Sequence, residues 1–172
     1  MGPFELIYYI GYSIIKSRRL RRQKRLPCKV ISVGNITTGG TGKTPAVIAL
    51  AEEAKRRGYQ PCILTRGYKG KAKGPCFVNE SGIKEEWAPD KEPLHELFGD
   101  EPVLMAERLR DVPIVKCSSR YEGGLFALKA LSARSSAISH QGLVFILDDG
   151  YQHWDLYRDM DILLIDNTNP FG

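Results

Sequence analysis

GNITTGGTGKTP, residues 34–45, joins an apolar β-type run to a segment of helical periodicity. A glycine-rich loop at such a junction lets successive backbone N–H groups face phosphate oxygens, and the helix that follows adds its positive dipole end. We therefore predict a phosphate-binding loop, preceded by a strand over Lys29–Val33 and followed by a helix over Lys43–Arg57 that Gly58 ends.

Two side chains of this loop carry the expected chemistry. Lys43 would reach the β- and γ-phosphates of a nucleoside triphosphate, and the Thr44 hydroxyl would hold Mg²⁺. The strict Walker pattern requires glycine where this chain has Thr37. The prediction therefore depends on the order of strand, loop and helix, and the competing interpretation is a glycine-rich surface turn before an ordinary helix.

Short apolar runs alternate with helical patterns along the rest of the chain. The predicted strands are Lys29–Val33, Cys62–Thr65, Pro113–Cys117, Leu143–Leu147 and Asp161–Ile165. The predicted helices between them are Lys43–Arg57, Glu101–Arg110 and Tyr121–Ala133. Continuous apolar strands separated by helices predict an α/β fold of the P-loop NTPase type, a mainly parallel sheet with helices on both faces. Residues 67–99 interrupt this order, and we expect a small hairpin there around Cys76–Val78.

Charge is concentrated at one end of the chain. The first 25 residues hold seven of the 25 Lys and Arg but one of the 20 acids, so the basicity is local and does not indicate nucleic-acid binding. The four cysteines form no C-x-x-C pair and are typical of small core residues in a reducing compartment, which argues against a thiolate metal site.

The N-terminal run PFELIYYIGYSII, residues 3–15, is apolar and aromatic, and seven cations follow it by residue 25. Its 13 residues fall short of the ~20 needed to cross a bilayer, and the charges follow the apolar run instead of preceding it as in a secretory signal. We predict that residues 1–26 form an amphipathic, basic helix at an anionic membrane surface. The alternatives are a helix packed on its own domain and, more weakly, an RNA-binding segment.

Two acids end the buried-type strand LVFILDDG, residues 143–150. In a phosphate-loop protein an acid at this place lies beside the loop threonine, and Asp148 and Asp149 are therefore the predicted Mg²⁺ ligands. Because neighbouring strand residues point in opposite directions, we expect the two carboxylates to have different tasks. The competing interpretation is a polar Asp-Asp-Gly turn.

Other polar residues follow predicted strands or open predicted helices. His153 comes just after the acidic pair and could orient an acid, donate to phosphate or bind a sugar. Arg66 and Arg120 follow two other strands, and either could clamp phosphate or form a surface salt bridge. Asp100 is placed to cap the N-terminus of a helix, and it could also accept a proton from an attacking hydroxyl.

These motifs together resemble the tetraacyldisaccharide 4'-kinase, or lipid A 4'-kinase, family. The resemblance runs through VISVGNITTGGTGKTP (30–45), LTRGY (64–68), GDEP (99–102), LDDGYQHW (147–154), RDMDILLID (158–166) and NPFG (169–172). It implies transfer of the γ-phosphate of ATP to the 4'-hydroxyl of a tetraacylated glucosamine disaccharide 1-phosphate. The implied place is the cytoplasmic face of a Gram-negative inner membrane, where the protein would be peripheral.

The resemblance also implies roles for particular residues. Nucleotide binding falls to Thr37, Thr38, Gly39, Gly40, Thr41, Gly42, Lys43 and Thr44, with Mg²⁺ held by Thr44, Asp148 and Asp149. Asp100 is the implied catalytic carboxylate. We predict that Lys43, Asp149 and His153 complete the catalytic set, with His153 included for its place just after the acidic pair. The family is longer than this chain, so residues 27–172 are expected to form an incomplete kinase core that lacks a second lobe.

Two other functions fit a phosphate-binding loop. One is a GTP-driven switch or metallochaperone ATPase, although no Asn-Lys-x-Asp guanine-reading sequence occurs in the chain. The other is a nucleotide-binding remnant that binds ATP without hydrolysis or transfer. Lipid-linked product would favour the kinase, a GTP preference with nucleotide-dependent partner binding would favour the switch, and ATP binding alone would favour the remnant.

Overall fold

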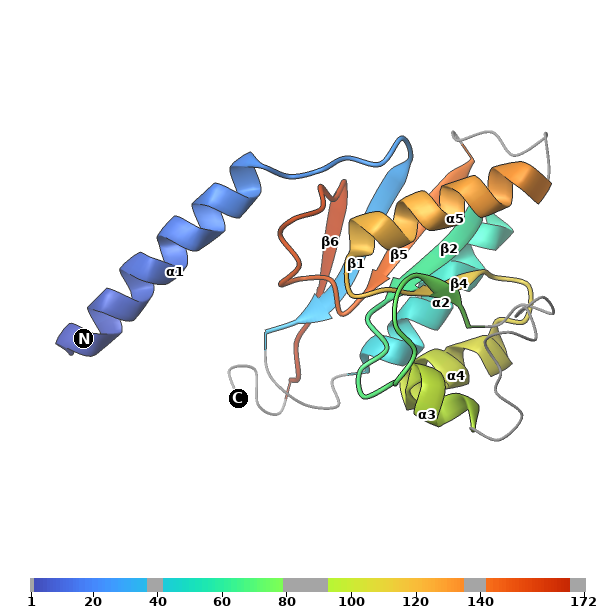
Figure 1. Ribbon diagram of the computed structural model, residues 1–172, viewed down its shortest axis with the longest axis horizontal. Coiled ribbons are helices and arrows are strands. Elements are labelled where there is room, and N and C mark those ends of the chain that lie inside the picture. The colour runs from blue at the N-terminus through green and yellow to red at the C-terminus, as the bar shows by residue number, and fades with distance from the viewer. Residues whose placement is uncertain (1, 37–41, 79–92, 135–141, 168–172) are drawn as a thin grey trace.

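The computed structural model describes residues 2–36, 42–78, 93–134 and 142–167 (Figure 1). The strands are β1 (Lys29–Asn35), β2 (Gln60–Thr65), β3 (Cys76–Phe77), β4 (Ile114–Lys116), β5 (Leu143–Asp148) and β6 (Met160–Leu164). The helices are α1 (Pro3–Arg21), α2 (Lys43–Arg56), α3 (Leu94–Phe98), α4 (Asp100–Arg108) and α5 (Arg120–Arg134). All five predicted strands and three predicted helices are confirmed, with ends that differ by one or two residues.

The six described strands form one sheet in the order β3-β4-β2-β5-β1-β6. β1 pairs in parallel with β5 and β6, and β2 pairs in parallel with β4 and β5. Only β3 runs antiparallel, against β4. The predicted mainly parallel sheet is therefore confirmed, and the carboxyl ends of its five parallel strands lie at one edge.

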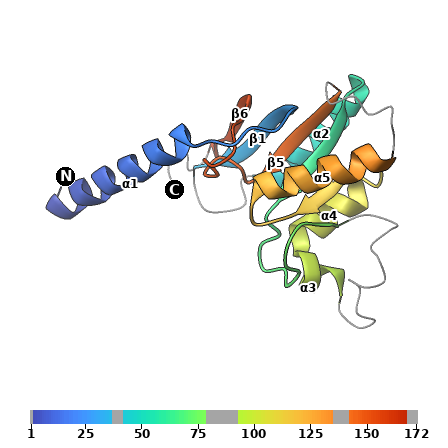
Figure 2. The ribbon, with the colours of Figure 1, turned by 45° about the horizontal axis from the view of Figure 1, so that its top comes forward.

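Helices cover both faces of the sheet, as predicted (Figure 2). On one face, buried side chains of α2 and α4 such as Val47 and Met105 pack with Ile63 and Ile146. On the other face, Leu128 and other residues of α5 pack with alternate positions of the same strands. The central strands are covered on both faces, so every residue of β5 is buried, whereas the edge strand β6 is only partly buried.

The interval between β2 and α4 differs from the predicted hairpin. Segment Cys76–Phe77 forms β3, whose partner is β4, and the Val78 amide donates to the Ile114 carbonyl at 2.8 Å. Residues 79–92, where a hairpin partner would fall, lie outside the described residues. The short helix α3 was not predicted from the sequence, because five residues are too few to show helical periodicity.

Asp100 does not cap a helix, so that interpretation of it is wrong. Gly99 is the N-cap residue of α4 with φ 93°, no side chain makes a capping hydrogen bond, and Asp100 is the first helical residue. A Cβ at Gly99 would lie 2.5 Å from the Tyr68 carbonyl oxygen, so the close approach of the two chain segments requires glycine there.

Helix α1 extends away from the sheet (Figure 1). Its exposed apolar side chains are Phe4, Leu6, Tyr8, Tyr9, Ile10, Tyr12, Ile14, Ile15 and Leu20. These positions surround the helix, so its polarity changes along the axis, from apolar to basic, and not from one face to the other as an amphipathic helix requires. Among the described helices, none has the length and apolarity that a membrane span needs.

The cysteines have the predicted structural character. Cys62 and Cys117 are buried, and Cys28 and Cys76 are half-buried, all four with free thiols. Burial, assisted by the charge of Asp159, raises the pKa of Cys28 to about 12, which keeps this thiol protonated and unreactive at neutral pH.

Candidate functional site

The predicted metal and phosphate groups meet at the carboxyl edge of the sheet. β1 and β5 are parallel neighbours with Val33 opposite Asp148, so the end of the acidic strand lies beside the start of the glycine-rich loop. Helix α2 then begins at Lys43 and returns its N-terminus to the same edge. The topology therefore brings Lys43, Asp148 and Asp149 together, although more than 100 residues of chain separate them.

Lys43 is held between two oxygen groups. Its ammonium donates to the Asn35 Oδ1 at 3.1 Å and lies 3.7 Å from the Asp149 Oδ1. The Lys43 side chain is 17% exposed, so its charge is partly shielded from water. Gly42, the N-cap residue of α2, has φ 77°, a left-handed conformation that glycine adopts readily. The other predicted loop contacts, Thr37–Thr41, lie outside the described residues.

The two adjacent acids have different surroundings, as expected from strand alternation. Asp148 is buried, and its Oδ2 accepts a 2.9 Å hydrogen bond from the Thr65 hydroxyl, while its Oδ1 has no partner among the described residues. Asp149 is exposed and takes the left-handed φ of 50° as the chain turns away from β5. One carboxylate is therefore fixed inside the edge of the sheet, and the other faces Lys43 from outside.

Burial raises the pKa of the Asp148 carboxyl, and the charge of Glu101 adds to this rise. The Thr65 hydrogen bond and the Arg120 charge act in the opposite direction and favour the ionised form. A buried carboxylate with one unpartnered oxygen destabilises the folded chain when no ligand is bound. Such a group is typical of a binding site for a cation.

Thr65 and Asn35 are site residues that the motif reading did not find. Both end strands and are buried, and each hydrogen bonds a predicted site residue. The Thr65 hydroxyl also accepts a 3.3 Å hydrogen bond from the Gly67 amide, which orients its proton toward Asp148. The available signal was a polar residue at the end of an apolar strand, but only the pairing of β2 with β5 shows which carboxylate Thr65 contacts.

Arg120 lies in the interior and is not the surface ion-pair residue considered from the sequence. Its Nη1 donates to the Cys117 carbonyl at 3.0 Å and its Nη2 donates to the Asp148 carbonyl at 3.1 Å, so it ties the start of α5 to the end of β5. Its Nε has no partner among the described residues. Burial lowers the pKa of the guanidinium, which still carries its charge at neutral pH.

A cavity of about 390 Å³ opens beside the acidic pair. Its lining includes Arg19, Arg66, Ser118, Arg120, Asp149, Gln152, His153 and Asp155. The half-buried His153 has its pKa lowered first by burial and then by the Arg120 charge. A neutral imidazole at this place can both donate and accept hydrogen bonds, as recognition of a hydroxyl-rich ligand requires.

Gly34 allows the chain after Asp149 to fold closely over β1. A Cβ at Gly34 would lie 2.5 Å from the Tyr151 Cβ and 2.9 Å from its backbone nitrogen. The Gly150 amide donates to the Val33 carbonyl at 3.0 Å, and the His153 amide donates to the Gly150 carbonyl at 3.0 Å. These backbone contacts hold the Asp149–His153 turn at the edge of the site.

Asp100 reaches the same edge of the sheet from α4. The segment after β2 packs on the turn before α4, since Gly99 closely approaches the Tyr68 carbonyl. Asp100 is exposed and lies in the first turn of α4, next to the Glu101 whose charge acts on Asp148. It does not line the cavity that contains His153.

The oxygen donors at the edge fit Mg²⁺. Mg²⁺ is usually bound by one or two carboxylates together with substrate phosphates and several waters. The unpartnered Asp148 Oδ1 and the exposed Asp149 carboxylate are oxygen groups of this kind, and Thr44 in the first turn of α2 is the third predicted ligand. Among the described residues no group of three or more His, Cys, Asp or Glu side chains could hold a metal ion.

The chain is similar to lipid A precursor kinases along its whole length. The family model for LpxK, tetraacyldisaccharide-1-P 4'-kinase, matches residues 1–172. Tetraacyldisaccharide 4'-kinase of Syntrophus aciditrophicus is 42% identical over 172 residues, which cover 98% of this chain and 42% of the relative. The Aquifex aeolicus enzyme of that name is 48% identical over 167 residues, which cover 95% of this chain and 47% of the relative.

A solved structure has the same fold. The crystal structure of "apo" form LpxK from Aquifex aeolicus in complex with ATP matches with a TM-score of 0.75 and 40% sequence identity. The match covers 97% of this chain and 48% of that chain. The chain therefore spans less than half the length of these relatives.

Proposed function

Because the chain belongs to the tetraacyldisaccharide-1-P 4'-kinase family, we propose that it carries the nucleotide-binding part of a lipid kinase. The reaction is transfer of the γ-phosphate of ATP to the 4'-hydroxyl of a tetraacylated glucosamine disaccharide 1-phosphate. ATP binding is supported by the ATP complex of the similar Aquifex aeolicus structure.

One observation carries the proposal. The Lys43 ammonium at the start of α2 lies 3.7 Å from the Asp149 carboxylate, and Asp149 directly follows the buried Asp148 with its unpartnered oxygen. We infer that this ammonium binds phosphate oxygens and that the two neighbouring carboxylates bind a metal ion, at the end of the glycine-rich loop. Phosphoryl transfer requires this arrangement because its catalysis is mainly positioning and charge stabilisation.

In the proposed reaction, Lys43 binds the β- and γ-phosphate oxygens and gives up its contact with Asp149. Thr44, Asp148 and Asp149 would hold Mg²⁺, which when bound neutralises charge on the phosphate oxygens. Thr65 fixes the Asp148 carboxylate so that Oδ1 remains the free oxygen. Arg120 keeps the end of β5 in place through the Asp148 carbonyl.

Asp100 is the proposed proton acceptor. The acceptor 4'-oxygen attacks the γ-phosphorus, the bond from that phosphorus to the bridging oxygen of ADP breaks, and the hydroxyl proton passes to the Asp100 carboxylate. The neutral His153 contacts a sugar hydroxyl from the neighbouring cavity. Arg66, exposed at the end of β2, contacts phosphate.

Exchange of Asp100 for asparagine tests this assignment. We expect Asp100→Asn to lower turnover about a hundredfold, because proton transfer by a placed base contributes about 10²–10⁴. The assay is transfer of label from γ-labelled Mg-ATP to detergent-dispersed disaccharide 1-phosphate, with ATP affinity measured separately and expected to stay unchanged. Asp111→Asn, at an exposed acid that pairs with Lys55 far from the site, is the control. Unchanged turnover of Asp100→Asn would exclude it as the base, and ATP binding by the wild-type chain without labelled lipid would favour the nucleotide-binding remnant over the kinase.

Peripheral attachment to the cytoplasmic face of an inner membrane is the proposed location. The exposed apolar side chains of α1 fit the bilayer interface, and the basic last turn with Arg18 and Arg21 fits anionic headgroups. Three residues of the helix face the protein. Tyr12 packs edge-on against Trp154 with ring centroids 5.2 Å apart, Lys16 lies 5.7 Å from the same ring, and Arg19 pairs with Asp155.

Binding to lipid vesicles tests the role of α1. We expect the chain to float with vesicles of phosphatidylcholine and phosphatidylglycerol, and less with phosphatidylcholine alone. Because each buried aromatic contributes about 1.5–3 kcal/mol, the double variant Phe4→Asp/Tyr8→Asp should bind at least about tenfold more weakly. Tyr59→Asp changes an exposed aromatic outside α1 and should bind like wild type. Equal flotation of the double variant would contradict an interfacial α1.

A further inference from the structure

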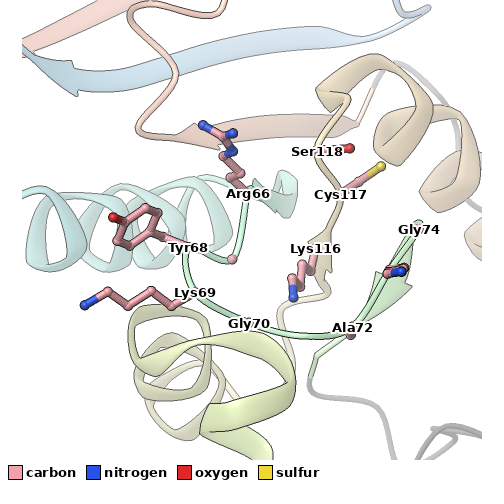
Figure 3. Close-up of a pocket in the computed structure, with 11 residues that line it drawn as sticks. Arg66, Tyr68, Lys69, Gly70, Ala72, Gly74, Lys116, Cys117 and Ser118 are labelled. Carbon is pink, nitrogen blue, oxygen red and sulfur yellow. The ribbon is translucent and has the colours of Figure 1, made fainter.

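A second cavity of about 370 Å³ lies at the same edge of the sheet, between the loop after β2 and the end of β4 (Figure 3). We call it the basic pocket, and its lining is Arg66, Gly67, Tyr68, Lys69, Gly70, Ala72, Lys73, Gly74, Lys116, Cys117 and Ser118. Four of these residues are cationic and none is acidic. The volume is ample for a phosphate group with part of the molecule that carries it.

The wall of the basic pocket is rigidly built. Lys116 extends from the end of β4 into the curve of the loop, where its ammonium donates to the Leu97 carbonyl at 2.8 Å (Figure 3). A Cβ at Gly67 would lie 2.6 Å from the Phe98 carbonyl oxygen and one at Gly70 would lie 2.5 Å from the Phe98 carbonyl carbon, so both positions need glycine. The Ala72 amide also donates to the Leu97 carbonyl, at 2.9 Å.

Lys116 is 3% exposed, so an ammonium is held inside the wall of the pocket. Among the described residues no acid forms an ion pair with it, and burial lowers its pKa. A charge buried without a counter-charge is unfavourable, and an anion in the pocket would relieve that cost. Lys71 differs from Lys116 in that it is exposed and its ammonium pairs with the Glu96 carboxylate at 2.7 Å.

The loop also carries backbone strain where it lines the pocket. Lys69 has φ 62° and Gly67 has φ 63°, and the turn is closed by a 3.1 Å hydrogen bond from the Gly70 amide to the Gly67 carbonyl. Lysine seldom adopts this left-handed conformation, and such strain persists where the surroundings enforce it, often at binding sites.

The basic pocket adjoins the candidate site. Arg66 and Ser118 line both the basic pocket and the cavity that contains Asp149 and His153. A molecule with a sugar hydroxyl beside His153 can therefore extend past Arg66 into the basic pocket. We propose that the basic pocket binds the phosphate monoester that the acceptor already carries, and so orients the acceptor for transfer at its other end. This inference rests on the proposed function.

A direct binding measurement tests the proposal without kinase turnover. The probe is glucosamine 1-phosphate, titrated into the ¹⁵N-labelled chain and followed by amide correlation spectra. We expect the amide signals of Gly67, Gly70 and Gly74 to shift, and we expect glucosamine without phosphate to leave them in place. Lys69→Gln/Lys73→Gln should weaken binding about fivefold or more, because charge-assisted contacts to phosphate are lost. The matched control Lys71→Gln should bind like wild type.

A second experiment distinguishes binding of the sugar phosphate from binding of the nucleotide phosphates. With a non-hydrolysable ATP analogue and Mg²⁺ at saturation, the signal of Lys43 should report the nucleotide while the sugar phosphate still shifts the loop. The proposal is overturned if the loop signals do not shift, if the double variant binds like wild type, or if the nucleotide displaces the sugar phosphate. Displacement would assign the pocket to the nucleotide. Absent kinase activity with intact binding would contradict the proposed function instead.

Discussion

Lys43→Ala should lower phosphoryl transfer by at least about a thousandfold, the loss typical when a main cationic contact to a transferring phosphoryl group is removed. The structure places the Lys43 ammonium 3.1 Å from the Asn35 side chain and 3.7 Å from Asp149, with the side chain only 17% exposed. No neighbouring cation from α2 is placed to replace it, because Lys55 lies at the far end of that helix. Transfer of label from γ-labelled Mg-ATP measures the effect.

Lys55→Ala is the matched control for Lys43→Ala. It removes a lysine from the same helix, where Lys55 pairs with Asp111, and should leave transfer unchanged. Thermal unfolding of both variants should stay near that of wild type, since exposed or half-exposed ion pairs contribute about 0–1 kcal/mol. Substantial labelled lipid from Lys43→Ala would show that the glycine-rich loop does not bind the transferred phosphate.

Asp148→Asn should have opposite effects on activity and stability. Transfer should fall at least about a hundredfold, because the variant removes the charge of a proposed metal ligand. The ligand-free chain should become more stable by about 0.5–2 kcal/mol, the gain common where a strained functional group is relieved. The cause is that Asp148 is buried with an unpartnered Oδ1, and asparagine keeps the hydrogen bond from Thr65 without the charge.

The pH dependence of stability follows from the raised pKa of Asp148. The folded chain holds this proton more tightly than the unfolded chain, so the free energy of unfolding falls as pH rises from the ordinary value of 3.8 through the raised pKa. Above that pH range the destabilisation by the ionised Asp148 is fully present. Asp148→Asn should therefore remove the part of the decrease in unfolding free energy that this carboxyl causes. Denaturant titrations across the acid range, in the absence of nucleotide and metal, measure it.

Asp149→Asn is the control for Asp148→Asn. Asp149 is 62% exposed, and its φ of 50° suits asparagine, so the stability should change by less than about 0.5 kcal/mol. If Asp148→Asn unfolds at a lower temperature than wild type, the interactions of the carboxylate with Thr65 and Arg120 outweigh its burial. That result would contradict the idea that this acid is kept for a cation at a cost in stability.

Local sequence signals were sufficient for the order of strands and helices and for the acids and glycines at the site. A continuous apolar run, a glycine-rich turn and a helical period each depend on residues close together in the chain. For that reason the parallel sheet, the start of α2 at Lys43 and the acidic end of β5 were all predicted. The position of the glycine-rich loop beside Asp148 was predicted because the carboxyl ends of parallel strands lie at one edge of the sheet.

Other features depend on contacts between distant segments, which only the fold supplies. Thr65 meets Asp148 because β2 and β5 are neighbours in the sheet, although 83 residues separate them. For Arg120 the sequence left phosphate binding and a surface salt bridge both open, because its burial depends on the end of β5. The helix-cap interpretation of Asp100 was wrong because the approach of Tyr68 to Gly99 is not visible in the chain. Hydrogen bonds, burial and backbone contacts of this kind follow from strand order and packing, and no short-range pattern contains them.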